Sequence, residues 1–292
     1  MMPRIDRRTL LCGLALLGAA PAVATAAAPP RIASLDYGLA ETLLALGVAP
    51  IAVAGARDWH RWVVEPKLPA AVADLGSPLA VNLELLTLLE PDLILSTDFV
   101  QRQEPALARI AETRRITLYE EGAIPLDRAR EAALTLGEML SREAAAEALL
   151  AEAERFFDQC RERAARLAVP PLLFVSFLDS RHARIYGGTG LYQSVLDRIG
   201  LPNGWKGVTN YWGFATIGLE QLATSEDVRL VAIEPMAADV KMALAASPLW
   251  TRLPFVAAGQ FSTLPPVLMF GALPSAMRFA RLLVEHLESL AA

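Results

Sequence analysis

Large aromatic rings in polar stretches are the residues of this sequence best suited to bind a small molecule. Trp59 and Trp62 lie in RDWHRWVVEP, and Trp212 lies in GVTNYWGFATIGLEQL. A tryptophan most often fills a core, but rings on loops at the carboxyl ends of strands can line a ligand cleft. The pattern therefore favours binding through ring faces, with core packing as the alternative for each ring.

Residue patterns for catalysis are missing from the sequence. It contains no Gly-x-Ser-x-Gly, no His-Glu-x-x-His and no phosphate loop that ends in Gly-Lys-Ser/Thr. The stretch from Gly187 to Gly190 could cradle a phosphate in an exported enzyme, but a tight turn is the simpler explanation of its glycines. His60, His182 and His286 are not clustered with cysteines, so we predict no metal site made of protein side chains.

The first 28 residues have the composition of an export signal. Arg7 and Arg8 belong to a basic stretch that precedes a short apolar run, and small residues follow as far as Ala28. Arg7-Arg8 before Thr-Leu-Leu resembles a twin-arginine signal, which is used to export folded proteins. Nothing after Pro30 is long and apolar enough to predict a transmembrane helix.

Charge and cysteine content narrow the function classes further. Removal of the signal takes three arginines and one aspartate from totals of 27 basic and 32 acidic residues, which leaves 24 and 31 and a net charge of −7. No basic stripe remains for nucleic acid. Cys160 is then the only cysteine, so no internal disulfide can form, and its place in a helical run predicts an inert thiol.

Short apolar runs alternate with helical patterns from Ile32 onwards. RIASLD, IAVAGA and DLILST are typical of buried strands, and YGLAETLLALG is typical of a helix that ends at Gly47. The second half repeats this plan with PLLFVSFL, RIYGG and GLYQSVLDRIG. Leu-Glu-x-Leu precedes an acidic break and a strand in both halves, starting at Leu83 and at Leu219. We therefore predict two similar α/β lobes.

A helical region from Leu126 to Ala168 separates the two halves. It lacks proline, has one glycine, and repeats apolar residues at helical spacing from Arg142 to Leu167. Without a flexible Gly/Ser hinge, such a helix would hold the lobes stiffly. The predicted segments are the export signal (1–28), an N-terminal lobe (29–141), an interlobe helix (142–168) and a C-terminal lobe (169–292).

Several segments, in the same order along the chain, resemble the periplasmic substrate-binding proteins of ABC importers that carry iron siderophores, cobalamin or haem. They extend from about Ile32 to Leu287 and are ETLLALGVAPIAVA, RWVVEPKLP, NLELLTLLEPDLI, LDSRHARIYG, LYQSVLDRIGLPNGWKGVTNYWG, ATSEDV, PLWTRLPFVAAGQF and GALPSAMRF. Within that family the chain resembles the ferric hydroxamate-binding members. The resemblance implies a monomeric, non-catalytic α/β protein with two Rossmann-like lobes joined by a single long rigid helix and a ligand cleft between the lobes.

The resemblance also implies which residues face the ligand. The pocket aromatics of the family fall on Tyr37, Trp62 and Trp212. The tyrosine that follows the third strand in the family becomes Phe99, and the ligand-binding arginine becomes Pro78.

Other pocket positions change in the same, apolar direction. In PPVLMFGA, which we predict to be the last pocket strand, the expected tryptophan and tyrosine become Leu268 and Phe270, with Met269 between them. A less anionic or more apolar chelate, or a citrate-hydroxamate chelate met by different cations, would fit such a pocket.

A different cation must replace the missing arginine if the charge-assisted bond is kept. Arg102 is the candidate, with Arg57 and Arg61 behind it, and a solvated loop charge is the alternative for Arg102. The predicted ligand-binding residues are Tyr37, Trp62, Phe99, Arg102, Trp212, Met269 and Phe270.

The resemblance also implies how the iron is held and which residues contact the importer. The siderophore's own oxygens wrap the iron in relatives, so the predicted ligand is an iron(III)-siderophore chelate with no cofactor and no protein metal ligand. Cobalamin or haem are the alternatives, and His60 beside Trp59 is the feature that favours haem. One acidic residue on each lobe docks onto the membrane permease in the family, and these positions fall on Glu104 and Glu220, although Glu220 could serve only a helix dipole.

Overall fold

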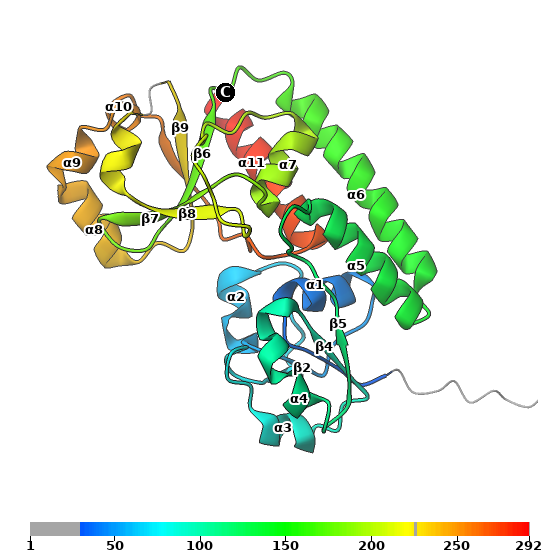
Figure 1. The fold of residues 1–292 in the computed structure, drawn as a ribbon. Helices are drawn as coiled ribbons and strands as arrows, with labels where there is room; N and C mark the ends of the chain where they lie inside the picture. The colour runs from blue at the N-terminus through cyan, green and yellow to red at the C-terminus, as the bar shows by residue number, and fades with distance from the viewer. Residues whose placement is uncertain (1–29, 225–226, 292) are drawn as a thin grey trace, which may run out of the picture.

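The computed structural model describes residues 30–224 and 227–291 of the 292-residue chain. The predicted export signal, residues 1–28, lies outside the described residues. Figure 1 shows two lobes, each built around one sheet, with two helices, α5 (Pro125–Met139) and α6 (Glu143–Ala164), along one side of the molecule. The fold is therefore α/β with two lobes, as predicted.

The first lobe is built on a five-stranded parallel sheet with the order β3-β2-β1-β4-β5. Its central strands are apolar and buried, as a sheet covered on both faces requires. Helix α1 starts directly after β1 because the Oδ1 atom of Asp36 accepts a hydrogen bond from the Leu39 amide at 3.0 Å and caps the helix. The elements are β1 (Ile32–Ser34), α1 (Tyr37–Ala45), β2 (Ala52–Val53), η1 (Ala56–Asp58), α2 (Trp59–Trp62), β3 (Ala73–Asp74), α3 (Leu83–Leu88), β4 (Leu93–Ser96), η2 (Asp98–Gln103), α4 (Glu104–Leu107) and β5 (Glu112–Arg115).

The second lobe departs from the predicted repeat because its sheet is mixed. The order is β10-β9-β6-β7-β8, and β7 is antiparallel to both of its neighbours. Only residues 178–181 separate β6 from β7, which is too short for a crossover and produces a hairpin. The elements are β6 (Leu172–Phe177), β7 (His182–Tyr186), α7 (Leu191–Ile199), β8 (Phe214–Gly218), η3 (Leu219–Thr224), β9 (Arg229–Ile233), α8 (Ala238–Ala246), α9 (Pro248–Thr251), α10 (Pro254–Ala257), β10 (Phe261–Leu264) and α11 (Leu273–Ala291).

The two Leu-Glu-x-Leu segments occupy corresponding places in the lobes. The first forms α3 and leads into β4, which pairs with β1. The second leads into β9, which pairs with β6, although it forms the 3-10 helix η3 and not an α-helix like the first. The internal similarity therefore covers the strand pairs β1/β4 and β6/β9 and does not extend to the β6–β7 hairpin.

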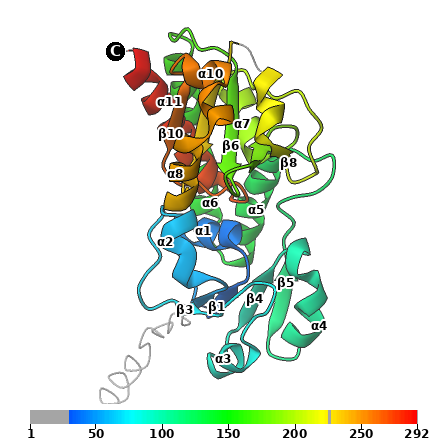
Figure 2. The same cartoon turned by 90° about the vertical axis from the view of Figure 1, so that its left-hand side faces the viewer.

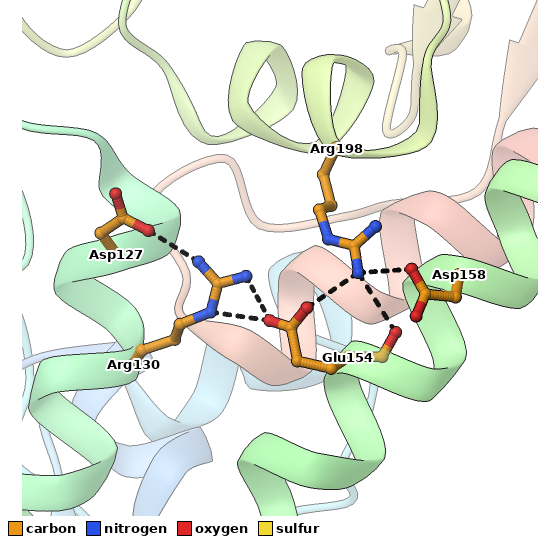
Figure 3. Close-up of polar contacts among 5 residues, drawn as sticks. All are labelled: Asp127, Arg130, Glu154, Asp158 and Arg198. Atoms are coloured by element: carbon orange, nitrogen blue, oxygen red, sulfur yellow. Dashed lines mark hydrogen bonds and ion pairs between the residues drawn. The ribbon is translucent and has the colours of Figure 1, made fainter.

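The helical region between the sheets contains two helices, α5 and α6, and the second matches the long helix that the sequence predicts. Figure 3 shows Glu154 of α6 between two arginines. Its Oε1 atom accepts a hydrogen bond from Nε of Arg130 on α5 at 3.0 Å, and its Oε2 atom lies 2.8 Å from Nη2 of Arg198 on α7. Arg198 also contacts Asp158, and Arg130 contacts Asp127. The network cross-links α5, α6 and α7.

A second junction between the lobes lies at the start of α11. Figure 2 shows α1 below the helices of the second lobe, and α1 packs directly on α11. The fully buried carboxylate of Glu41 on α1 accepts hydrogen bonds from the Ala272 amide at 2.6 Å, the Ser275 amide at 3.2 Å and the Ser275 hydroxyl at 2.6 Å. One hydrophobic core continues from Leu39 on α1 to Phe279 on α11. The lobes are thus held by more than the predicted single helix.

The stretch PPVLMFGA is a loop between β10 and α11, so the predicted last pocket strand is wrong. Side chains satisfy the carbonyls that a strand would pair with a neighbouring strand. The Tyr119 hydroxyl donates to the carbonyls of Met269 at 3.0 Å and Gly271 at 2.8 Å, and the Tyr192 hydroxyl donates to that of Val267 at 2.6 Å. Because Tyr119 follows β5 in the first lobe, these bonds fix the loop between the lobes.

The surroundings of Cys160 suit an inert thiol. Cys160 is buried on α6, and burial raises the pKa of its thiol, which suppresses the reactive thiolate. Within residues 30–224 and 227–291, no helix has both the length and the apolar character needed to cross a membrane.

Candidate functional site

A cleft of about 550 Å³ lies between the two lobes, as the sequence predicts. The first lobe lines it with residues that follow β1, β2, β4 and β5. The second lobe contributes strands β7 and β8, the residues around the carboxyl ends of β6 and β9, and the loop after β10. Ligands of open α/β sheets bind at the carboxyl ends of strands, so the position of the cleft is that of a binding site.

Trp212 is the ring at which the two lobes meet. Its centroid lies 6.1 Å from that of Phe99 and 5.6 Å from that of Tyr119, both in the first lobe. It lies 5.3 Å from Phe270 and 4.6 Å from Tyr211 in the second lobe. The pairs with Phe99 and Phe270 are edge-to-face, a favourable geometry for aromatic rings, and the pairs with Tyr119 and Tyr211 are tilted. The cluster gives the cleft an apolar wall made by both lobes.

The glycine-rich loop supports the turn that carries Trp212. The Gly213 amide donates to the Asn210 carbonyl at 2.9 Å, and Gly213 has a φ of +81°, which favours glycine. A Cβ atom at Gly213 would lie 2.0 Å from Cα of Gly190. The Gly187 amide also donates to the Gly213 carbonyl at 3.0 Å. Close backbone packing explains these glycines, which removes the reason to propose a phosphate cradle.

The structure brings six of the seven predicted ligand-binding residues together in the cleft. They are Tyr37, Trp62, Phe99, Trp212, Met269 and Phe270. Trp62 is 40% exposed and Phe99 is 51% exposed, so both rings remain available to a ligand.

The predicted cations are not in the cleft. Arg102 is exposed on η2 and does not line it. Arg57 pairs with Asp74 at 3.1 Å, and Arg61 lies over the ring of Trp62 at 4.9 Å from the centroid. The short 3-10 helix η2 turns Arg102 toward solvent, which the sequence alone did not show.

Arg184 is the cation that the sequence analysis missed. It lies on β7, where Ala183 and Ile185 are buried and Arg184 and Tyr186 line the cleft. Its guanidinium carbon lies 4.9 Å from the ring centroid of Phe214. Within the described residues no carboxylate forms an ion pair with it. The signal in the sequence was an arginine alternating with apolar residues in a buried strand.

The tyrosine hydroxyls of the cleft already have partners in the protein. Tyr37 donates to the Gly55 carbonyl at 2.6 Å, and Tyr186 donates to Oγ of Ser176 at 2.9 Å. Burial raises the pKa of Tyr37 to about 12 and the pKa of Tyr192 well above its usual value. The hydroxyls therefore stay protonated, and Arg184 is left as the charged donor among the described lining residues.

Trp59 and His60 lie away from the cleft. The first six residues of RDWHRWVVEP, 57–62, belong to the short helices η1 and α2, and the last four are irregular. Trp59 is 3% exposed, packs edge-to-face on Tyr37 at 5.6 Å, and donates from Nε1 to the Pro66 carbonyl at 2.8 Å. It is a core residue. His60 lines a separate depression with Lys67, so it cannot reach a ligand in the cleft.

The predicted docking residues have different surroundings. Glu104 accepts hydrogen bonds from Nε of Arg115 at 2.7 Å and from the Ser96 hydroxyl at 2.8 Å, and the bond from Arg115 lowers the pKa of its carboxyl. Glu220 is exposed at the start of η3. Glu84, in the first turn of α3, is exposed at the corresponding place in the first lobe.

Comparison with known proteins assigns the family. The sequence matches the periplasmic binding protein family over residues 32–268, and this match covers most of the chain. The chain belongs to this family. Within the described residues, no group of three or more histidine, cysteine or carboxylate side chains is arranged to hold a metal ion. The members of this family are periplasmic binding proteins, so this chain is a binding protein and not an enzyme.

Several members of the family are similar to this chain. The iron(3+)-hydroxamate-binding protein FhuD of Escherichia coli K12 is 37% identical over 286 residues, which cover 97% of this chain and 96% of FhuD. The achromobactin-binding periplasmic protein of Dickeya dadantii is 30% identical over 61% of this chain and 57% of its own length. The structure of the siderophore-binding protein FhuD from Vibrio cholerae, bound to Fe3+-Desferal, superposes with a TM-score of 0.82 and 27% identity, covering 89% of this chain and 98% of that one.

Proposed function

We propose that this chain is the periplasmic substrate-binding component of an ABC importer and that its cleft captures an iron(III)-siderophore chelate of the hydroxamate type. The observation that carries the proposal is the aromatic cleft around Trp212, which both lobes wall. Among the described lining residues, Arg184 is its one cation and forms no ion pair with a described carboxylate. Ring faces can cover the apolar arms of a chelate, and a guanidinium can donate to hydroxamate oxygens. Similarity to the two FhuD proteins supports the same ligand class.

The iron enters as cargo in this proposal. A siderophore supplies all the oxygen ligands of the ferric ion, so the protein has to recognise the outside of the chelate. The Tyr37, Tyr119 and Tyr192 hydroxyls, which are protonated and bonded to carbonyls, suit a wall that shapes the cleft and does not ligate iron. The haem alternative loses its main support because His60 lies outside the cleft.

Quenching of tryptophan fluorescence tests the ligand class. Ferrichrome and ferrioxamine B are expected to quench the emission of the purified protein, while cobalamin and hemin are not. Trp212→Ala should weaken ferrichrome binding by at least about fivefold, because about 1 kcal/mol of ring contact is lost. Trp205→Phe is the control, since it also removes one of the five tryptophans but lies outside the cleft.

Two outcomes would contradict the proposal in different ways. Quenching by hemin or cobalamin, with no response to either ferric hydroxamate, would show that the proposed ligand class is wrong. Ferrichrome binding by Trp212→Ala at the affinity of the parent would show that the ligand sits elsewhere. Isothermal titration calorimetry of the same variants separates a loss of signal from a loss of affinity.

The proposal extends to export and to delivery. Residues 1–28 would direct the chain to the periplasm through the twin-arginine route, and the loaded monomer would dock on an inner-membrane permease through acidic residues of both lobes. Glu220 and Glu104 are the predicted pair. Glu84 competes with Glu104 for this role, because Arg115 and Ser96 already hold the Glu104 carboxylate and Glu84 corresponds to Glu220 in the internal repeat.

Uptake of radiolabelled ferrichrome by cells that lack the chromosomal copy tests the docking residues. Glu84→Ala and Glu220→Ala are each expected to lower uptake severalfold without changing ferrichrome affinity, because an acidic rim residue acts on the encounter with arginines of the permease. Glu104→Ala serves as the comparison and should change uptake less. If Glu104→Ala and Glu220→Ala lose ferrichrome uptake while Glu84→Ala transports normally, the pair predicted from the sequence is correct and Glu84 has no docking role.

A further inference from the structure

The charged groups that line the cleft are mostly acidic. Among the residues that the structure describes, the ionisable acids and bases on its wall other than tyrosine are Asp36, Asp98, Glu234 and Arg184. All other lining side chains are aromatic, aliphatic or neutral. The cleft therefore presents three carboxylates and one guanidinium to a ligand.

Two of the carboxylates have cations behind them. Asp98 lies 3.4 Å from Nη1 of Arg115, but the same guanidinium forms a two-pronged ion pair with Glu104. One cation shared by two carboxylates leaves one negative charge in excess. Glu234 lies 2.8 Å from Nζ of Lys241, so this second pair is neutral.

The third carboxylate has no cation in contact. Asp36 caps α1 through the Leu39 amide, and no ion pair within the described residues involves it. Burial raises the pKa of its carboxyl to about 6, which leaves it largely ionised at neutral pH. Its charge and that of Arg184 offset each other. The excess negative charge of the Asp98–Glu104–Arg115 group then sets the sign of the net charge of the cleft, which is about −1.

We propose that the cleft selects ferric chelates by charge, admitting neutral and cationic trihydroxamate chelates and rejecting chelates that carry a net negative charge from carboxylate ligands. The inference rests on the proposed function. Three hydroxamates lose one proton each and neutralise Fe³⁺. A citrate-dihydroxamate siderophore binds through two hydroxamates, a carboxylate and a deprotonated hydroxyl, so its ferric complex has a charge of −1.

Like-charge repulsion acts with force inside such a cleft. Its apolar walls lower the local dielectric constant and strengthen interactions between charges. In the sequence, the loss of the arginine at Pro78 was compatible with either a less anionic ligand or a citrate-hydroxamate ligand held by another cation. The exposed position of Arg102 removes the second cation, and the structure favours the less anionic ligand.

Three ferric chelates of different charge test the proposal by calorimetry. They are ferrioxamine B, which carries a free ammonium, neutral ferrichrome, and the anionic citrate-dihydroxamate chelate ferric schizokinen. We expect ferric schizokinen to bind at least about tenfold more weakly than ferrichrome at low ionic strength. This gap between the two Kd values should shrink in about 0.5 M salt. Asp98→Asn and Glu234→Gln should each reduce the ratio of the Kd of ferric schizokinen to that of ferrichrome, measured on the same variant, by about threefold. Glu112→Gln removes a carboxylate at the far end of β5 and is the control.

The outcomes separate this inference from the function on which it rests. Ferric schizokinen binding as tightly as ferrichrome would overturn charge selection and leave the proposed function standing. A gap that neither Asp98→Asn, Glu234→Gln nor salt changes would also overturn it, because shape would then be the cause. Failure of all three chelates to bind would overturn the proposed function, and charge selection with it.

Discussion

Replacement of Arg184 by alanine is expected to weaken ferrichrome binding by about 10- to 100-fold. A hydrogen bond from a charged donor contributes about 1.5 to 3 kcal/mol, and loss of that amount corresponds to this change in Kd. Arg184 forms no ion pair within the described residues and touches the ring of Phe214, so its removal should cost little stability. Arg184→Lys should bind with intermediate affinity, since an ammonium lacks the forked geometry of a guanidinium. Titration calorimetry measures each Kd.

Arg102→Ala is the matched control for Arg184→Ala. It removes the same charge from the 3-10 helix η2, which also carries Phe99, but from a side chain that does not line the cleft. Ferrichrome affinity should change by less than about twofold, as expected of an exposed charge screened by salt. The opposite pattern, a large loss in Arg102→Ala and none in Arg184→Ala, would restore the assignment made from the sequence.

The parts of the fold that depend on local sequence were predictable. The pattern of apolar residues and terminal glycines located α1 and α7, and Gly200 ends α7 in the left-handed conformation expected of a helix stop. The family resemblance placed Trp212 and Phe270 in the cleft, because short matching motifs keep their position relative to the sheets. Both kinds of inference need only neighbouring residues.

The parts that depend on long-range contacts were not predictable in this way. PPVLMFGA has the apolar composition of a strand, but Tyr119 and Tyr192, far away in the sequence, bond its carbonyls and hold it as a loop. Arg184 was missed because its side chain faces the cleft only once β7 pairs antiparallel with β6 and β8. The prediction that Arg102 faces the ligand was wrong because the 3-10 helix η2 turns its side chain toward solvent.

Glu41 makes the joint between the lobes sensitive to pH. Burial raises the pKa of its carboxyl to about 7 from 4.5, and this effect exceeds the opposite effect of the hydrogen bonds from Ser275 and Ala272. The folded state therefore favours the neutral acid. Its contribution to the free energy of unfolding is fully present below about pH 4.5 and is lost as the pH rises through about 7. The full loss is about 3 kcal/mol.

Glu41→Gln is expected to reduce the fall in unfolding free energy between pH 5 and pH 8 by about 2 to 3 kcal/mol, because an amide has no charge to bury. The amide oxygen can still accept from the Ala272 and Ser275 amides, and its NH2 can donate to the Ser275 hydroxyl. Urea denaturation at several pH values measures the change. Glu285→Gln removes an exposed carboxylate from α11 and should keep the pH dependence of the parent. If Glu41→Gln also keeps it, Glu41 is ionised throughout this range, and its three donors outweigh its burial.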